Sequence, residues 1–490
     1  MTALNGEIPL ECMQLIKKLF VMVPCLVFWS CSAFFYEAGE IVIEKPCTVE
    51  DVTPTEPVLP EEPAIKERQW TILVYMCADN DLEAAAMEDL CEMEFSDLDT
   101  DEVSVLALVD RSPAYDTSYD NWYGSRLYKL KTGKEADSSS LISQEIECKD
   151  LGLEVGKETE LDMSSSYVLS SSLSYARKRF PANHYGLIIW GHGTGWRSGD
   201  IEASELNSEG YQSGIFKGFS YDKTSGTYMT LYQTGQAMKA GLGGMKLDFL
   251  GFDTCYGAEL EVLYELKDYA VLCAGSEGLV SASGWNYREL FSLFGKSGKQ
   301  PADLCSCVVA QFKNQYAHTV GASVACVNMD GVSAFFSACN ELWSECALQI
   351  NSTTVRDSVM RLLYSANPCE VRRYTYGTGG SDVYLDIASM MKALKNYFDE
   401  NKITQLYDAF NECKAALITN SWSFEDGEGG IGVYFSSLSD SSNLSVSHPA
   451  MYVKGACVDQ IAFVNECEGY VPCSREGKSF LSKLFYVQFQ

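Results

Sequence analysis

The stretch LDFLGFDTCYGAELEVLYELKDY, residues 247–269, decides the fold class of this chain. Leu247–Phe252 is apolar almost throughout, as expected of a strand that is buried on both faces of a sheet. Ala258–Tyr269 repeats its apolar residues at helical spacing. An apolar strand that runs directly into an amphipathic helix is typical of a parallel sheet whose two faces are covered by helices.

The same alternation recurs on both sides of this stretch. Further strands are expected at residues 70–76, 103–110, 185–190 and 270–274, and helices at residues 79–95, 165–180, 231–240 and 302–319. Asn80 or Asp81 is placed to cap the first of these helices. We therefore predict an α/β fold with a mostly parallel central sheet over residues 69–350. From residue 351 to 490 the pattern loosens into helices plus the strand-like GGIGVYF, which predicts a smaller C-terminal subdomain.

The N-terminus has the pattern of an export signal. Lys17 and Lys18 precede the apolar run Leu19–Trp29, and Ser30-Cys31 follows it, so residues 1–31 are expected to be a signal peptide. A small residue before Cys31 resembles the bacterial lipoprotein signal, in which that cysteine carries the lipid. Lipidation, ordinary cleavage and a poorly ordered apolar tail all stay open. Residues 32–68, rich in Glu and Pro, predict a flexible linker.

Composition excludes some partners. The formal net charge of −30 repels phosphate backbones and anionic membrane surfaces, so nucleic acid is not an expected partner. The 19 cysteines are expected to be mostly packed thiols, because a chain of 490 residues buries a core without disulfides. Cys305 and Cys307 form a close pair on a helix without nearby histidines, which argues against zinc.

Two strand ends carry reactive side chains. The strand ending at Trp190 leads to His192, and the strand ending at Phe252 leads to Cys255. Parallel strands present such residues at one edge of the sheet, where ligands bind. A neighbouring imidazole and the N-terminus of the helix expected from Ala258 would both favour a nucleophilic thiolate at Cys255. The amides of Gly193 and Cys255 would stabilise an oxyanion.

Each of these residues also has a structural interpretation. A buried cysteine at a strand end is commonly a small core residue, and a histidine between glycines can simply complete a turn. GHGTG as a phosphate-binding turn is disfavoured, because a polar segment from Arg197 and not a helix follows it.

The motifs WTILVYMCADNDLE, HYGLIIWGHGTGW, KLDFLGFDTCYGAELEVLYELKDYA and GSEGLVSASGWNY together resemble clostripain-type cysteine peptidases, relatives of caspases, legumain and gingipains. The resemblance covers roughly residues 70–327. It implies a caspase-like α/β/α sandwich, His192 as catalytic base and acid, and Cys255 as nucleophile. The amides of Gly193 and Cys255 would form the oxyanion hole.

The resemblance also implies the substrate. The family cleaves peptide bonds after Arg or Lys through acidic side chains in its specificity pocket, and Asp253 matches the first of these acids. The second would stand at position 283, where this chain has Ser283. Glu277 is either a substitute for the missing acid or an ordinary surface acid. The expected partner is a peptide or protein with a basic residue before the scissile bond.

Three further expectations follow from the resemblance. The enzyme would be a zymogen cleaved between His192 and Cys255, with Lys217 and Lys223 as processing candidates and Arg197 as a weaker one. No cofactor is expected. Calcium, which clostripain uses, stays an alternative, with Asp79, Asn80 and Asp81 able to ligate a cation although a helix cap is the simpler role.

The chain would then be an exported bacterial endopeptidase, either secreted or held at the outer membrane or cell surface through a lipid on Cys31. The alternative is a divergent surface lipoprotein that binds peptide or protein ligands on the same fold without turnover.

Overall fold

The computed structural model describes residues 68–135, 140–196, 218–364, 371–376, 382–426, 430–436, 462–470 and 478–485. All of these belong to one compact unit, Pro63–Gln490. The predicted signal peptide with Cys31, the predicted linker up to residue 67, and the processing candidates Arg197 and Lys217 lie outside the described residues.

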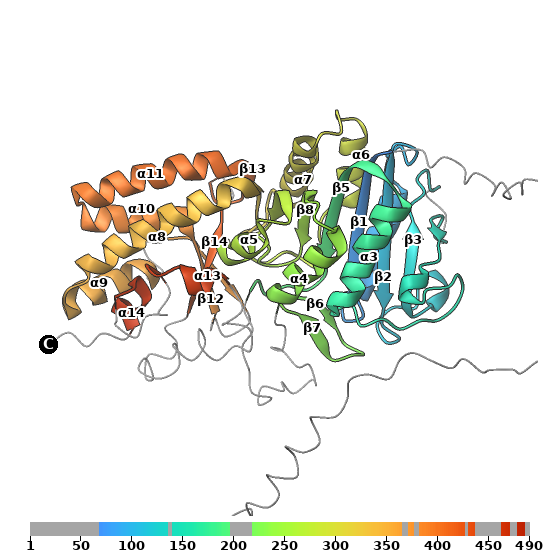
Figure 1. Ribbon diagram of the computed structural model, residues 1–490, viewed down its shortest axis with the longest axis horizontal. Helices are drawn as coiled ribbons and strands as arrows, with labels where there is room; N and C mark the ends of the chain where they lie inside the picture. The colour runs from blue at the N-terminus through green and yellow to red at the C-terminus, as the bar shows by residue number, and fades with distance from the viewer. Residues whose placement is uncertain are drawn as a thin grey trace, which may run out of the picture. The chain divides into compact units, whose positions relative to one another are not determined.

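Within the described residues a nine-stranded sheet runs in the order β13-β10-β9-β8-β5-β1-β2-β3-β4 (Figure 1). Its five central strands are parallel to their neighbours within this group: β9 (Ala270–Gly275), β8 (Leu247–Asp253), β5 (Ala182–Trp190), β1 (Arg68–Ala78) and β2 (Val103–Arg111). The strands outside them pair antiparallel: β3 (Gly124–Lys129), β4 (Gln144–Glu145), β10 (Ser323–Asn328) and β13 (Ile418–Ser423). The expectation of a mostly parallel central sheet in an α/β fold is confirmed.

Helices cover both faces of the sheet, and two buried clusters fill the spaces beneath them. The first cluster packs under α3 (Ser166–Arg179), α4 (Leu231–Leu242) and α5 (Leu260–Leu266), of which α3 and α4 lie in front of the sheet in Figure 1. The second packs under α2 (Glu83–Glu94), α6 (Tyr287–Gly295) and α7 (Pro301–Tyr316). Alternate residues of β1 belong to opposite clusters, Tyr75 to the first and Val74 to the second, which explains why this strand is apolar throughout.

The chain beyond α7 continues the first cluster. It contributes α8 (Val332–Gln349), α9 (Thr353–Tyr364), α10 (Ile387–Phe398), α11 (Asn401–Leu417), α13 (Ala462–Glu466) and α14 (Phe480–Phe485). A second sheet joins β11 (Arg373–Tyr376), β12 (Asp382–Asp386) and β14 (Gly432–Ser436), the last of which is the predicted strand GGIGVYF. Because β13 pairs with β10, the predicted peptidase domain and C-terminal subdomain share the main sheet.

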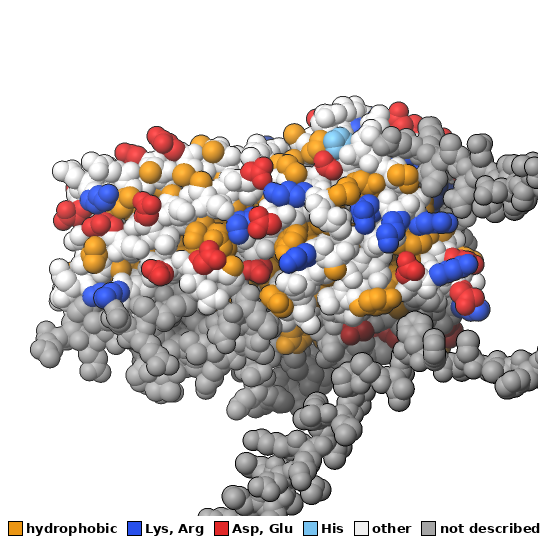
Figure 2. Space-filling model, in the orientation of Figure 1, with side chains coloured by type: hydrophobic (Ala, Val, Ile, Leu, Met, Phe, Trp, Pro, Cys, Tyr) orange, Lys and Arg blue, Asp and Glu red, His pale blue; other side chains and the backbone are white. Residues whose placement is uncertain are grey.

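The remaining elements are short. The β6 (Phe219–Asp222) and β7 (Thr227–Met229) strands form a hairpin beside β1. The described residues also include the short 3-10 segments η1 (Tyr119–Asn121), η2 (Lys149–Leu151) and η3 (Met329–Gly331). The face in Figure 2 mixes acidic, basic and scattered apolar side chains. The described helices include none with the length and hydropathy needed to cross a bilayer.

Two predicted helix starts are wrong. Helix α2 begins at Glu83 with Leu82 as N-cap, and no side chain caps it; Asn80 instead closes a local turn by accepting a hydrogen bond from the Leu82 amide at 3.0 Å. Helix α5 begins at Leu260 and not at Ala258, because the Ala258 amide donates to the Ser276 carbonyl at 2.9 Å and is held by a neighbouring segment.

The cysteines agree with their prediction. Those in the described residues form no disulfide bonds, and most of them are buried, including Cys305 and Cys307 on α7. They therefore act as small apolar side chains in the core.

Candidate active site

The two reactive strand ends lie side by side. Strands β5 and β8 are neighbours in parallel register, with Trp190 opposite Asp253, and the Gly191 amide donates to the Asp253 carbonyl at 3.2 Å. The loops that follow therefore leave the sheet at one edge. His192 and Cys255 both line a single cavity of about 330 Å³ there. The structure thus brings together the imidazole and the thiol that the sequence pairs.

Gly193 holds the two loops in close contact. A Cβ atom at this position would lie 2.6 Å from the Cys255 carbonyl oxygen and 2.8 Å from the Thr254 side chain. Only glycine allows this approach of the two backbones. The sequence assigns Gly193 an oxyanion role through its amide, and the structure shows that its missing side chain is also needed for packing against residues 254 and 255.

His192 has an acidic neighbour that the sequence analysis did not assign to it. Its Nε2 lies 2.8 Å from Oδ1 of Asp81, which leads from β1 towards α2. The hydrogen bond to His192 lowers the pKa of Asp81, so this carboxylate stays ionised at neutral pH. A base that is oriented by a third group is a common feature of nucleophilic sites. Asp81 is thus a partner of the imidazole and neither a helix cap nor a free cation ligand.

Cys255 is held as a thiol in this conformation. Its Sγ accepts a hydrogen bond from the Val280 amide at 3.3 Å and lies 3.6 Å from the Val280 carbonyl oxygen. Burial raises the pKa of the Cys255 thiol to about 11. The expected activation by a helix N-terminus is wrong, because α5 begins only at Leu260 and the Tyr256 amide donates to the Gly278 carbonyl. Formation of a thiolate here depends on a proton acceptor such as His192.

Asp253 forms a buried acidic wall of the same cavity. It is 3% exposed, and its Oδ2 accepts hydrogen bonds of 3.0 Å from the Trp285 amide and the Tyr287 hydroxyl. Its Oδ1 is buried without a hydrogen-bond partner among the described residues. Burial raises the pKa of Asp253 to about 7. An open acceptor atom in a cavity of this kind suits a cationic ligand group.

Two more acids, both on α2, interact electrostatically with Asp253, and the sequence analysis did not identify either of them. Asp89 is 3% exposed and accepts a hydrogen bond from the Trp190 indole at 2.7 Å. Burial and then the charge of Asp253 raise the pKa of Asp89 well above its ordinary value. Glu92 accepts from the Tyr287 amide at 2.9 Å and also raises the pKa of Asp253. Their helical spacing in AMEDLCEME gave no sign that they face the strand end.

The segment after β9 supplies the opposite wall of the cavity. Leu279, Val280, Ser281, Ala282 and Gly284 line it, whereas Ser283 is exposed beside them. Gly284 packs on the acid: a Cβ atom there would lie 2.7 Å from Asp253 Oδ2. The position that the resemblance assigns to a second pocket acid therefore carries a hydroxyl at the rim.

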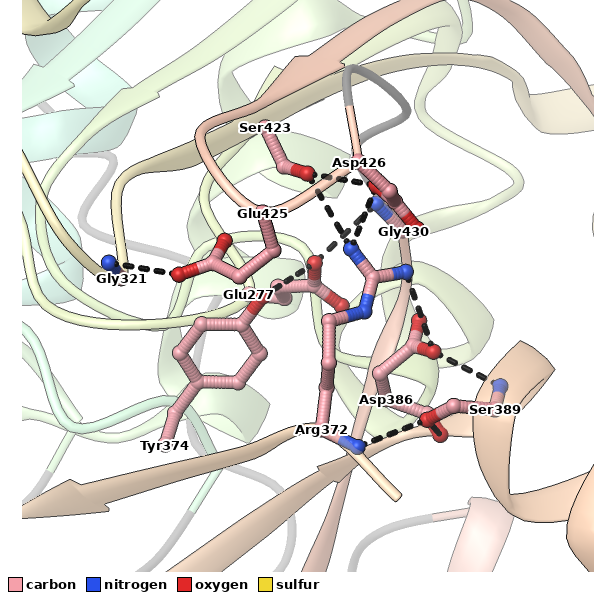
Figure 3. Close-up of polar contacts among 10 residues, drawn as sticks. All are labelled: Glu277, Gly321, Arg372, Tyr374, Asp386, Ser389, Ser423, Glu425, Asp426 and Gly430. Atoms are coloured by element: carbon pink, nitrogen blue, oxygen red, sulfur yellow. Dashed lines mark hydrogen bonds and ion pairs between the residues drawn. The ribbon is translucent and has the colours of Figure 1, made fainter. Parts of the chain in front are cut away.

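Glu277 is not a surface acid. It is fully buried, accepts a hydrogen bond of 2.7 Å from the Tyr374 hydroxyl, and faces Arg372 and Asp386 in a polar cluster (Figure 3). Burial, followed by the charge of Asp386, raises the pKa of Glu277 to about 8. The cluster connects the wall segment to β11, β12 and the Gly430 amide, which donates to Glu277 at 3.1 Å. Glu277 therefore stabilises the segment after β9 that lines the cavity, although Glu277 itself does not line it.

Lys223 lies in the turn of the β6–β7 hairpin. Its side chain is exposed and stacks on the Tyr115 ring, 4.3 Å from the ring centroid. Its backbone is held, because the Lys223 amide donates to the Asp79 carbonyl at 2.9 Å and the Thr224 amide donates to Asp79 Oδ2 at 2.6 Å. The bond after Lys223 is therefore fixed against β1.

Of the three residues considered as cation ligands, only Asp79 belongs to a group that could hold a metal. Its carboxylate meets those of Asp110, Glu160 and Asp222, with one oxygen of each lying within 4.8 Å of the others. The Asn80 side chain is occupied by backbone groups, including the Cys77 and Tyr221 carbonyls. The sequence did not reveal this group, because its members come from four separate segments.

Comparison with known proteins gives a consistent result. The model of the Clostripain family matches residues 74–444, about three quarters of the chain. Clostripain from Hathewaya histolytica is 26% identical over 242 residues, a match that covers 48% of this chain and 43% of that protein. The matched region thus spans less than half the length of this relative.

Solved structures share the fold. An inactive zymogen C11 protease from Parabacteroides distasonis superposes with a TM-score of 0.55 at 17% identity, covering 82% of this chain and 98% of that one. A secreted C11 cysteine protease from Bacteroides thetaiotaomicron, solved with an irreversible peptide inhibitor, gives a TM-score of 0.53 at 17% identity, covering 82% of this chain and 99% of that one.

Proposed function

The chain belongs to the clostripain family, and we propose that it is a cysteine endopeptidase that cleaves peptide bonds after Arg or Lys. The observation that carries this proposal is the shared cavity of His192, Cys255 and the buried carboxylate of Asp253. It contains a nucleophile, a base and an anionic pocket wall, which are the groups that such a reaction needs.

The proposed reaction begins with transfer of the Cys255 proton to His192. Since burial holds the pKa of this thiol at about 11, substrate binding and the imidazole must together favour the thiolate. The sulfur then attacks the carbonyl carbon, and the amides of Gly193 and Cys255 donate to the oxyanion. The imidazolium protonates the leaving amine, and water releases the acyl group from sulfur with His192 as base. Asp81 keeps the ring oriented and stabilises its charged form.

Specificity for a basic side chain follows from the charges around the pocket. A guanidinium or ammonium group beside Asp253 would pair with the unpartnered Oδ1. The charge of Glu92 adds negative potential at Asp253. We propose that Glu92 compensates for the hydroxyl at Ser283, where the family commonly has an acid.

A panel of fluorogenic peptides tests this function. Peptides with Arg or Lys before the scissile bond should be cleaved, and those with Asp, Asn or Leu should not. Cys255→Ala and His192→Ala should each abolish cleavage, whereas Cys91→Ala, which changes a half-buried thiol elsewhere, should not. Binding of the peptides without turnover by the unaltered protein would favour the alternative, a divergent surface protein that only binds peptides.

We also propose that the protein is activated by cleavage between His192 and Cys255. Lys217 is a better candidate for this cleavage than Lys223. The bond after Lys223 is tied to Asp79 by two amides, so cleavage there needs local unfolding. Lys217→Ala should leave the chain intact on electrophoresis, and Lys223→Ala should leave cleavage unchanged. If Cys255→Ala protein stays intact when purified alone, the cleavage is autocatalytic.

Export is proposed from the N-terminal segment alone. If Cys31 carries a lipid, Cys31→Ser should move the protein from the membrane fraction to the soluble fraction or the medium. A protein that fractionates identically with and without this change is not anchored through Cys31.

A further inference from the structure

One tyrosine of the second sheet contacts the backbone that follows both reacting residues. Tyr384 lies in β12, the middle strand of that sheet, and its side chain is buried. Its ring stacks on the Tyr256 ring, with the centroids 4.1 Å apart and the ring planes at 29°. Its hydroxyl donates a hydrogen bond of 3.2 Å to the Thr194 carbonyl. Tyr256 directly follows Cys255 and Thr194 lies two residues after His192, so a single side chain reaches both loops.

The backbone of Tyr256 has a conformation that its side chain disfavours. Its φ of 58° lies in the left-handed region, which glycine adopts freely and an aromatic residue rarely adopts. Such a conformation persists only where the surrounding structure determines it. Here the Tyr256 amide donates to the Gly278 carbonyl at 3.0 Å, and the buried Tyr256 ring lies against Tyr384. The stack therefore stabilises the turn in which the chain leaves Cys255.

The loop after His192 is held from two sides. The Thr194 amide donates to the Gly218 carbonyl at 2.9 Å, and the Gly218 amide donates to the Thr194 hydroxyl at 2.7 Å. The Thr194 carbonyl accepts from the Tyr384 hydroxyl on the other side. Because Thr194 directly follows Gly193, whose amide is a proposed oxyanion donor, a shift of Thr194 would move that amide as well.

The second sheet holds Tyr384 in its place. Tyr384 pairs with Tyr374 of β11 and with Tyr434 of β14. Its ring meets the Tyr434 ring edge-on, with the centroids 5.4 Å apart, and the Tyr434 ring meets the Trp196 ring edge-on at 5.8 Å. Edge-on pairs of this kind are a favourable aromatic geometry. The position of the sheet is thus transmitted to the two loops through one buried aromatic group.

We propose that Tyr384 is a positioning residue of the peptidase, which fixes the loops after Cys255 and His192 relative to one another. This role rests on the proposed function, because Tyr384 acts through the nucleophile and the base. Tyr384 does not line the cavity that holds them, so it acts on their geometry and not on the substrate. A small displacement of reacting groups costs a large part of the rate. The loss of Tyr384 should therefore lower kcat and leave KM nearly unchanged.

Steady-state kinetics on an Arg peptide measures this split. Tyr384→Leu removes the stack and the hydrogen bond, and it should lower kcat by about 100-fold while KM changes by less than about threefold. Tyr384→Phe keeps the ring and should lower kcat by only about three- to tenfold. Tyr75→Phe is the matched control, because it removes another buried hydroxyl, which donates to the Met163 carbonyl at 2.7 Å outside the cavity. Tyr75→Phe should keep its kcat even if its melting temperature falls.

Two variants of Tyr256 test the turn itself. Tyr256→Gly and Tyr256→Ala both remove the ring, but only glycine accepts the positive φ without strain. Tyr256→Gly should therefore retain a kcat at least about threefold above that of Tyr256→Ala. A kcat for Tyr256→Ala that equals or exceeds that of Tyr256→Gly contradicts the role assigned to the stack.

Alkylation of Cys255 by iodoacetamide reports on the loop without any peptide cleavage. The reaction is followed by mass spectrometry on the peptide that carries Cys255. Burial raises the pKa of this thiol to about 11, so a loop released by Tyr384→Leu should expose the thiol and increase its alkylation rate at pH 8 by about tenfold or more. The buried Cys273 on β9 should stay unreactive, which distinguishes release of the loop from unfolding of the chain.

The outcomes separate this inference from the proposed function. If the unaltered protein cleaves Arg peptides and Tyr384→Leu has the same kcat as Tyr75→Phe, the positioning role is overturned. If Tyr384→Leu unfolds, as faster alkylation of Cys273 would show, Tyr384→Phe and the two Tyr256 variants decide, and an unchanged kcat in Tyr384→Phe overturns the role. If the unaltered protein cleaves no peptide, the proposed peptidase fails, and alkylation of Cys255 alone then decides whether Tyr384 holds the loop.

Discussion

Asp81 Oδ1 lies 2.8 Å from His192 Nε2 and connects the imidazole to the end of β1. The side chain of Asp81 is about half exposed, so its ion pair with the ring is open to solvent and weaker than a buried one. Its main effect is therefore on the orientation of the ring.

Asp81→Asn should lower kcat by about 10- to 100-fold and change KM little, since the carboxylate acts through His192 and not on the substrate. Steady-state kinetics on an Arg peptide measures this effect. Asp101→Asn, which changes an exposed acid, is the control and should match the unaltered protein. An Asp81→Asn enzyme with full kcat would remove Asp81 from the mechanism.

Gly193→Ala should lower peptidase activity by about tenfold or more and also lower the melting temperature, because the new methyl group would overlap the Cys255 carbonyl. Gly235→Ala in α4 is a suitable comparison. Its Cβ would meet neighbours only at 3.5 Å or more, so activity and stability should be retained. Equal behaviour of the two variants would contradict the close contact of the loops.

The rate of cleavage after Arg should depend on the ionisation of Asp253. The pKa of this acid is raised to about 7, so the fraction with a charged pocket increases as the pH rises through that value. We expect kcat/KM to rise over the same range through KM. Asp253→Asn should lower kcat/KM by about 100-fold and remove this rise. Glu92→Gln should produce a smaller loss, and a loss confined to kcat would argue against a role in specificity.

Stability should fall as the pH rises from about 4.5 to about 8. Burial raises the pKa of Glu261 to about 7 and that of Glu277 to about 8, above their unfolded value of about 4.5. The folded state therefore binds more protons between these values. The destabilisation is absent below the unfolded pKa of about 4.5. It grows as the pH rises from there to the folded pKa of each acid, and it is complete above that folded pKa. The melting temperature should be several degrees higher at pH 6 than at pH 8.5.

Glu261→Gln provides the check on that prediction. The amide cannot ionise, so the difference between the two melting temperatures should become smaller in this variant. A melting temperature of the unaltered protein that rises with pH over this range would contradict the prediction, because it would mean that the charged forms of these buried acids are stabilised in the folded state.

The central strands and the meeting of His192 and Cys255 in one cavity could be predicted from local sequence. A strand such as β8 is apolar because both of its faces are covered, and residues after parallel strands meet at one edge by geometry alone. Neither conclusion requires knowledge of distant contacts. The antiparallel edge strands gave weaker signals, because β4 has only two residues and β13 reaches the sheet from far along the chain.

The surroundings of the pair could not be predicted, because they depend on segments that meet only in the folded chain. Asp89 faces Asp253 through the packing of α2, and Glu277 is buried by β11 and β12. The state of Cys255 depends on Val280, which lies 25 residues away in sequence. Sequence alone therefore predicted that His192 and Cys255 meet but misjudged the environment of the thiol.

The antiparallel pairing of β13 with β10 has a consequence for how this chain tolerates truncation. A chain that stopped before residue 418 would free those backbone amides and carbonyls of β10 that face β13, while β9 would still pair with the other side. Other chains could then add as strands to this open edge of the sheet. The segment that carries β13 is thus a cover for one side of the main sheet and not a removable appendage.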